Sequence, residues 1–170
     1  MSYSSAALAT FAHILGTLDH LAGKAQKAEV PADHLAEARL ADDMLPLESQ
    51  FRIAVNQVYM ALGRVWDMEI PHEETPLASF DDVRAMLAKA RDHVAAAGER
   101  DAAAHDAEID MTLPNGMRFV MAAHEYLRDW TMPNFYFHAT TAYAILRKEG
   151  LELGKIDFVG FLARYARPTG

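Results

Sequence analysis

The sequence contains no cysteine. This absence excludes disulfide bonds, a thiolate nucleophile and zinc sites built on thiolates. The chain also lacks an uninterrupted run of roughly 18 apolar residues, the length that a membrane-spanning helix needs. It does not begin with the charged and then apolar pattern of a signal peptide. We therefore expect a cytoplasmic protein without a membrane partner.

Positive charge is scarce. The chain has 16 Lys and Arg residues against 24 Asp and Glu residues, which gives a formal net charge of −8. The basic residues form neither a stripe nor a cluster, and an acidic surface repels phosphate groups. We therefore expect no nucleic-acid partner.

β-Branched residues are few, whereas alanine, leucine and methionine are frequent. This mixture favours helices, because these side chains lose little conformational freedom in a helix. Hydrophobic residues make up 51% of the chain and charged residues 24%, the balance of a folded globular domain. A chain of 170 residues is long enough for one domain with a sizeable core, which we place over residues 1–170.

Apolar residues recur at steps of three and four along most of the chain, which predicts amphipathic helices. The expected long helices cover residues 4–27, 46–68, 80–97 and 133–148, and shorter ones cover 31–39 and 122–130. Ser4 or Ser5 and then Ser79 are the expected N-caps, and Gly98 and Gly150 follow two of the expected C-termini. Joined by short connections, the long helices predict an all-α four-helix bundle.

Two segments depart from the helical pattern. Residues 109–113 and 117–121 alternate in polarity around Pro114-Asn115-Gly116, which predicts a small hairpin near 109–121. The tail after Gly150 has few periodic residues, and we expect it to pack irregularly.

One of the eight histidines points into the expected core. His138 shares a helix face with Phe135 and Ile145, and a buried imidazole needs a hydrogen-bond partner or a metal ion. Asn134 lies one turn earlier at the edge of the same face, and Gln50 flanks the apolar stripe of the second long helix. These three side chains could meet inside the bundle. The sequence leaves two readings open, a polar cluster of the core or a functional site.

The other histidines and the carboxylates show no spacing that is typical of a site. His13 and His20 lie opposite the apolar stripe of the first helix, so we expect them on the solvated surface. His34, His72 and His105 have no partner at ligand spacing, and His93 and His124 lie at the edge or outside of their apolar stripes. Asp42 and Asp43 form an acidic pair whose more common role is capping a helix start rather than acid–base catalysis.

The last long helix carries a second apolar face. Tyr136, Phe137 and Tyr143 cannot face the same core as His138, because helical rotation places them elsewhere. Such a face is normally covered by another element or by another subunit. We therefore expect a homodimer.

Two segments carry a family resemblance. Residues 133–147 (PNFYFHATTAYAILR), followed by Gly150 and by residues 154–158 (GKIDF), resemble the signature of an uncharacterised family of bacterial and fungal domains. Residues 38–47 (ARLADDMLPL), followed by Gln50, resemble the other signature of that family. The family is similar to a branch of the DinB/YfiT-like metalloenzyme superfamily.

The resemblance implies a four-helix bundle that is often dimeric. It also implies a divalent metal such as nickel, zinc or iron, held by three histidines, and thiol-transferase or hydrolase activity. By position, Gln50 corresponds to the ligand on the second helix, and Asn134 and His138 correspond to the pair on the last helix. Only one of the three histidines is retained, and side-chain amides are weak ligands for transition metals.

Two functions follow from this pattern. The favoured one is a bundle without an intact three-histidine metal site, in which Gln50, Asn134 and His138 line a small-ligand site or a vestigial metal site. Self-association is part of the same hypothesis. The alternative is a divalent-metal-dependent enzyme that uses His138 with Gln50 and a carboxylate such as Asp43.

Overall fold

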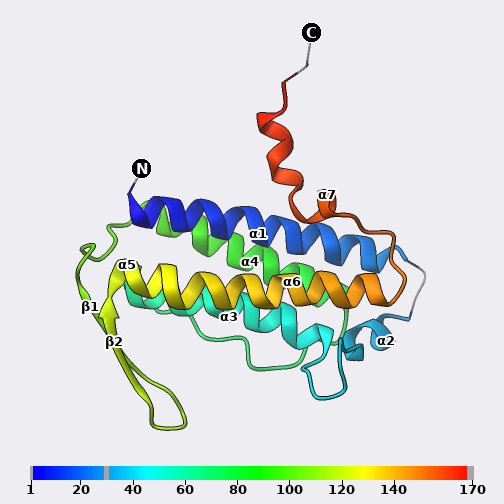
Figure 1. Ribbon diagram of the computed structural model, residues 1–170, viewed down its shortest axis with the longest axis horizontal. Coiled ribbons are helices and arrows are strands. Elements are labelled where there is room, and N and C mark those ends of the chain that lie inside the picture. Colours follow the sequence, from blue (N-terminus) through cyan, green and yellow to red (C-terminus); the bar gives the residue numbers. More distant parts are fainter. Residues whose placement is uncertain (1, 29–30, 168–170) are drawn as a thin grey trace.

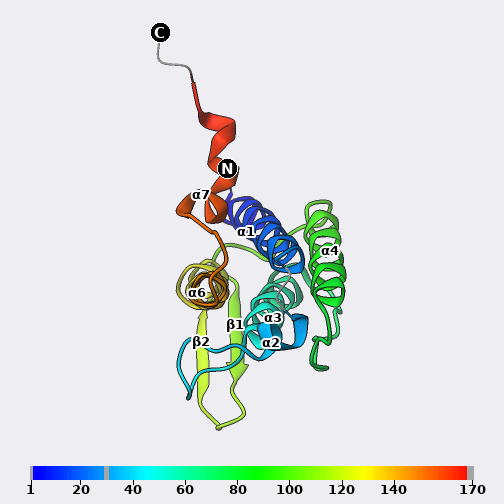
Figure 2. The same cartoon turned by 90° about the vertical axis from the view of Figure 1, so that its right-hand side faces the viewer.

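The computed structural model describes residues 2–28 and 31–167. Over these residues, four long helices form a bundle (Figures 1 and 2), and they are α1 (Tyr3–Gln26), α3 (Leu47–Trp66), α4 (Phe80–Ala97) and α6 (Met132–Lys148). Helix α1 packs on α4, α4 on α3, and α3 on α6. The expected all-α four-helix bundle is confirmed. In the described part of the chain, no helix is both long and apolar enough to cross a membrane.

The core consists of the apolar stripes that the helical spacing predicts. Phe11 of α1, Phe51 of α3 and Phe135 of α6 are fully buried. The rings of Phe11 and Phe135 meet edge to face with their centroids 5.6 Å apart. This contact joins α1 to the start of α6.

Ser79 and Gly150 lie at the helix ends where they are expected, whereas the cap at the start of α1 differs. Ser79 caps α4, and its hydroxyl accepts a hydrogen bond from the Asp82 amide at 3.1 Å. At the start of α1 the prediction of Ser4 or Ser5 was wrong, because Ser2 is the cap and accepts from the Ser5 amide at 3.0 Å. Ser2 has extended backbone angles, whereas the next residues are already helical. Gly150 follows α6 with φ +90°, a conformation that favours glycine.

The connection between α3 and α4 is long because of the direction of these helices. Phe51 near the start of α3 and Val83 near the start of α4 line one small cavity, so α3 and α4 run in parallel. Residues 67–79 must therefore return along the bundle before α4 can begin. Asn56 holds this return segment, because its side chain both donates to the Glu73 carbonyl and accepts from the Glu73 amide at 2.9 Å. The preceding connection contains the short helix α2 (Ala32–Glu37).

The expected hairpin is confirmed. Strands β1 (Glu108–Thr112) and β2 (Arg118–Ala122) pair in antiparallel register, with Asp110 opposite Val120. Gly116 lies in the turn with φ +84°. On the exposed side of the hairpin, Arg118 contacts both carboxylate oxygens of Asp110, at 2.9 and 2.6 Å.

The segment before α6 differs from the expected interrupted helix. Helix α5 (Ala123–Glu125) continues into the π-helix η1 (Tyr126–Thr131), which leads directly into α6. Pro133 lies in the first turn of α6, where a missing N–H group is tolerated. The expected start of the last long helix near Pro133 is thus confirmed, whereas the expected gap between residues 130 and 133 is filled by the end of the π-helix.

The tail is more regular than expected, since it contains α7 (Lys155–Phe158) and the 3₁₀-helix η2 (Gly160–Tyr165). The carboxylate of Asp157 anchors α7 on α1, because it accepts hydrogen bonds from His20 Nε2 at 2.8 Å and Lys24 Nζ at 3.1 Å. These donors and the backbone amide of Gly154 hold the pKa of Asp157 well below its usual range. Beyond α7, η2 projects away from the bundle (Figures 1 and 2).

The tail also changes the surroundings of two histidines on α1. His20 is exposed as expected, although it bonds Asp157. His13 is half-buried, and the expectation of a solvated side chain was wrong for it. The Phe161 ring stacks on its imidazole with centroids 4.8 Å apart. The face of α1 that carries His13 and His20, which the helical spacing predicts to be exposed, is thus partly covered by residues from the other end of the chain.

Candidate functional site

The structure brings Gln50 of α3 and His138 of α6 together. The Nδ1 atom of His138 lies 2.8 Å from Oε1 of Gln50. An amide oxygen only accepts hydrogen bonds, so Nδ1 carries the hydrogen and donates it. The Gln50 amide nitrogen in turn donates to the Leu45 carbonyl at 2.9 Å, which fixes the orientation of the amide. In neutral His138 the lone pair is therefore on Nε2.

Burial keeps this imidazole neutral. Gln50 is 2% exposed and His138 is half-buried. Burial lowers the pKa of His138 from its ordinary value of 6.5, because removing water penalises the charged ring. At pH 7 the neutral ring with an available Nε2 acceptor is thus the main form. Such a ring can accept a hydrogen bond from a ligand or take a proton from one.

Asn134 does not share the bond between Gln50 and His138. Its side-chain amide donates to the Trp130 carbonyl at 2.7 Å, one turn earlier in its own helix. The side chain is half-buried and lies one turn before His138 on α6. Asn134 therefore supports the junction between η1 and α6 through this hydrogen bond.

The side chains around His138 do not fit the three-histidine metal site of the superfamily. Among residues 2–28 and 31–167, no group of three or more His, Asp or Glu side chains could hold a metal ion. The oxygen of Gln50 already accepts from His138 Nδ1, and Asp43 is exposed in the turn before α3. A metal ion on His138 would have Nε2 as its only imidazole ligand. The expected capping role of Asp42 and Asp43 was wrong for α3, whose N-cap Pro46 has no side-chain cap.

The interface between α3 and α6 carries further polar groups. The two helices are antiparallel, since Gln50 meets His138 and Arg64 meets Tyr126 at the other end. Between these pairs lie Gln57, 8% exposed, and Thr131, 0% exposed. Within the part of the chain that the structure describes, Gln57 Oε1 and Thr131 Oγ1 have no hydrogen-bond partner. The antiparallel register places both residues in the same layer, between the two contacts.

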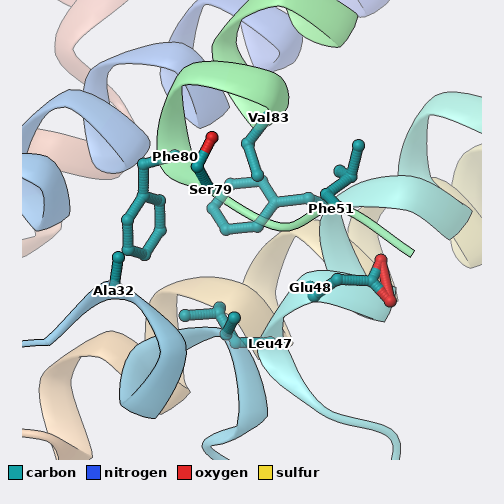
Figure 3. A pocket seen from close by; sticks show the side chains of 9 residues that line it. Ala32, Leu47, Glu48, Phe51, Ser79, Phe80 and Val83 are labelled. Carbon is teal, nitrogen blue, oxygen red and sulfur yellow. The ribbon is translucent and has the colours of Figure 1, made fainter.

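A small cavity where α2, α3 and α4 meet is not a ligand site (Figure 3). Its volume is about 10 Å³, which is room for one water molecule at most. Leu47, Phe51 and Phe80 surround it, and the Glu48 carboxylate points away from it in Figure 3. That carboxylate instead bonds Arg52 Nε at 2.9 Å.

The structure brings together two histidines for which the sequence indicates no site. His105 precedes β1 and His124 follows β2, and their rings stack with centroids 3.8 Å apart. His124 Nδ1 donates to the His105 carbonyl at 2.9 Å. The predicted hairpin could have indicated this contact. Its register pairs Glu108 with Ala122 and so brings the flanking residues close together.

The second apolar face of α6 is covered only in part. Tyr143 packs against Phe158 of α7 with ring centroids 5.7 Å apart, so another element covers this position. Tyr136 and Phe137 are 40% and 57% exposed. The expected second apolar surface is therefore reduced to the first half of α6.

Comparison with known proteins agrees with this architecture. The four long helices form a bundle of the DinB-like kind. The family described as "Domain of unknown function (DUF1993)" matches residues 3–159, and the chain belongs to this family. Among solved structures, the chain is similar to a DinB family member protein from Shewanella denitrificans, with 28% sequence identity and a TM-score of 0.73. That match covers 96% of this chain and 92% of the other. Among curated proteins, none matches this chain.

Proposed function

We propose that this protein binds a small polar ligand at His138 rather than a metal in a three-histidine site. The observation that carries the proposal is the 2.8 Å contact between His138 Nδ1 and Gln50 Oε1. It makes Nε2 the acceptor, and burial keeps the ring neutral. Hydrogen bonds are stronger where water is partly excluded, so one well-placed acceptor can orient a ligand.

The surroundings of His138 indicate which ligands fit. The Phe137 ring meets the His138 ring edge to face with centroids 5.2 Å apart, and this phenyl group is largely exposed. Leu45, whose carbonyl holds Gln50, is also exposed. An imidazole acceptor between exposed apolar side chains suits a small neutral molecule with one hydrogen-bond donor, such as a phenol, an amide or a thiol.

Histidine-selective ¹⁵N NMR tests the proposal with phenol, N-methylacetamide and 2-mercaptoethanol as probes. We expect at least one probe to shift the Nε2 resonance of His138 in a saturable manner, with the Nδ1 hydrogen retained. The shift should be lost in His138→Gln and kept in His72→Gln, which alters an exposed loop histidine. If no probe moves the resonance, or if Nδ1 carries no hydrogen, the proposal fails.

Metal analysis of the protein, together with the same spectra, tests the alternative function. That alternative is a divalent-metal enzyme of the thiol-transferase or hydrolase type. Stoichiometric nickel, zinc or iron in untagged protein, lost in His138→Gln, would replace the polar-ligand proposal with a metal site. Metal binding at an imidazole nitrogen also gives a resonance shift distinct from that of a hydrogen bond.

A cytoplasmic location stays a prediction of the sequence.

We further propose a homodimer that uses the exposed part of the second α6 face. Phe137 is more than half exposed beside exposed Tyr136, and exposed aromatic groups of this kind are enriched at interfaces. Light scattering should give twice the chain mass for the parent protein and a shift toward monomer for Phe137→Ser. A monomeric parent protein at high concentration would contradict this proposal. Val120→Ser, at an exposed apolar position of the hairpin, is the control.

A further inference from the structure

A second hollow lies on the other side of α6 from His138. It is a cleft of about 370 Å³ between the start of α1 and the helical segment η1–α6. Both elements lie at the same end of the bundle (Figure 1). Ten residues line it, namely Tyr3, Ala6, Ala7, Thr10, His105, His124, Leu127, Arg128, Met132 and Tyr136. Its volume lies within the range of roughly 300–1,000 Å³ that is typical of small-molecule sites.

The polar groups of this cleft are basic or neutral, although the chain as a whole carries a net charge of −8. Arg128 supplies a permanent positive charge. It contacts Asp129 through Nε at 2.7 Å and through Nη2 at 2.6 Å, which leaves the Nη1 hydrogens for another acceptor. The π-helix η1 carries Arg128, and π-helical turns often occur at functional sites.

The stacked histidines form the second part of the polar wall. His124 Nδ1 donates to the His105 carbonyl, so the nitrogen left for a ligand is Nε2. Tyr3 meets the His105 ring edge to face at 5.4 Å, and its hydroxyl donates to the Ala103 carbonyl at 2.7 Å. These contacts hold the two imidazole rings in place before any ligand arrives, which lowers the entropic cost of binding.

The remaining wall is apolar. Ala6 and Ala7 of α1 face Leu127 of η1 and Met132 of α6, and the ring of Tyr136 completes the wall. This combination suits a ligand with a flat or compact apolar body and one anionic group. The parallel stacking of the two imidazoles makes a chelating metal site a poor match, since their nitrogen lone pairs do not converge.

We propose that this cleft binds a small organic anion, with Arg128 at the anionic group and with the His124 ring and the Leu127–Met132–Tyr136 wall against the apolar body. The carboxylate accepts hydrogen bonds from Arg128 Nη1. Charge-assisted bonds of this kind are shorter and stronger than neutral ones. The site is separate from the one at His138, because it opens between α6 and α1 rather than between α6 and α3.

Chemical-shift titration with benzoate, benzamide and acetate tests the proposal. Benzamide has the shape of benzoate without the charge, and acetate has the charge without the ring. We expect benzoate to perturb the amides of residues 124–136 and to bind about tenfold more tightly than either of the other two probes. Equal affinity for benzoate and benzamide would overturn the anionic assignment, and equal affinity for benzoate and acetate would overturn the apolar one.

Two variants and one matched control test whether benzoate binds in this cleft. Arg128→Gln and His124→Asn should each weaken benzoate binding by about tenfold. Asparagine can still donate to the His105 carbonyl, so it removes the imidazole ring from the cleft wall and retains the anchor. Arg118→Gln should leave binding unchanged, because the pair of Arg118 and Asp110 in the hairpin has the same bidentate geometry outside the cleft. Unaltered binding in both cleft variants, or an equal loss in Arg118→Gln, would overturn the proposal, as would the absence of any benzoate-induced shift in these amides.

Discussion

Replacing Phe135 with alanine should lower the free energy of unfolding by about 3–5 kcal/mol. The ring is fully buried between α1 and α3, and it meets Phe11 edge to face at 5.6 Å. Its removal loses the transfer free energy of the ring and leaves a cavity that close-packed helices fill only in part. Urea denaturation followed by circular dichroism measures the change.

Two controls make the prediction for Phe135 specific. Tyr165→Ala removes an aromatic ring that is 62% exposed, so its effect should stay within about 0.5 kcal/mol. A double-mutant cycle of Phe11→Ala and Phe135→Ala should give a coupling energy of about 0.5–1.5 kcal/mol, which is typical of aromatic pairs. A loss below that of Tyr165→Ala would show that Phe135 does not occupy the core position described here.

Replacing Gln50 with leucine should destabilise the protein by about 1–3 kcal/mol and release the His138 ring. Leucine is similar in size but offers no acceptor to His138 Nδ1 and no donor to the Leu45 carbonyl. The matched control is Gln57→Leu, two turns further along α3. Within the described residues Gln57 Oε1 has no hydrogen-bond partner, so this change removes no bond at that atom. Equal losses for the two variants would contradict the role given to Gln50.

The pH dependence of stability gives an independent measurement of the same contact. Burial lowers the pKa of His138, so the unfolded chain binds the proton more tightly than the folded protein does. The contribution of His138 to stability is therefore fully present above the ordinary pKa of 6.5, and it is lost as the pH falls through the folded value. His138→Gln should remove this part of the profile.

Gln50→Glu should reverse the sign of this pH dependence. A carboxylate next to Nδ1 favours the charged ring and raises the pKa of His138. Its stabilising effect is then present below the unfolded pKa and is lost as the pH rises through the folded value. Denaturation midpoints of the parent protein and the two variants from pH 5 to pH 8 would show the difference. Parallel profiles would mean that Gln50 does not contact the imidazole in solution.

Helical spacing by itself determined the four long helices and the inward direction of His138, and alternating polarity around a Pro-Asn-Gly turn determined the hairpin. These features depend on local periodicity and on residues such as Ser79 and Gly150, whose conformational preferences act within a few positions. The pairing of Gln50 with His138 was also within reach, because both lie on or beside apolar faces of helices that must pack together.

Only the tertiary structure decided the rest. Helix direction is not contained in a periodic pattern, so the parallel arrangement of α3 and α4 was not predictable. The same holds for Asn134, whose amide bonds its own helix, and for His13, which the distant Phe161 covers. His105 and His124 come together because the hairpin closes between them, and their basic cleft needs α1 from the other end of the chain as its second wall. A binding site made from three distant segments depends on how the helices pack, and the spacing of residues within each segment does not specify that packing.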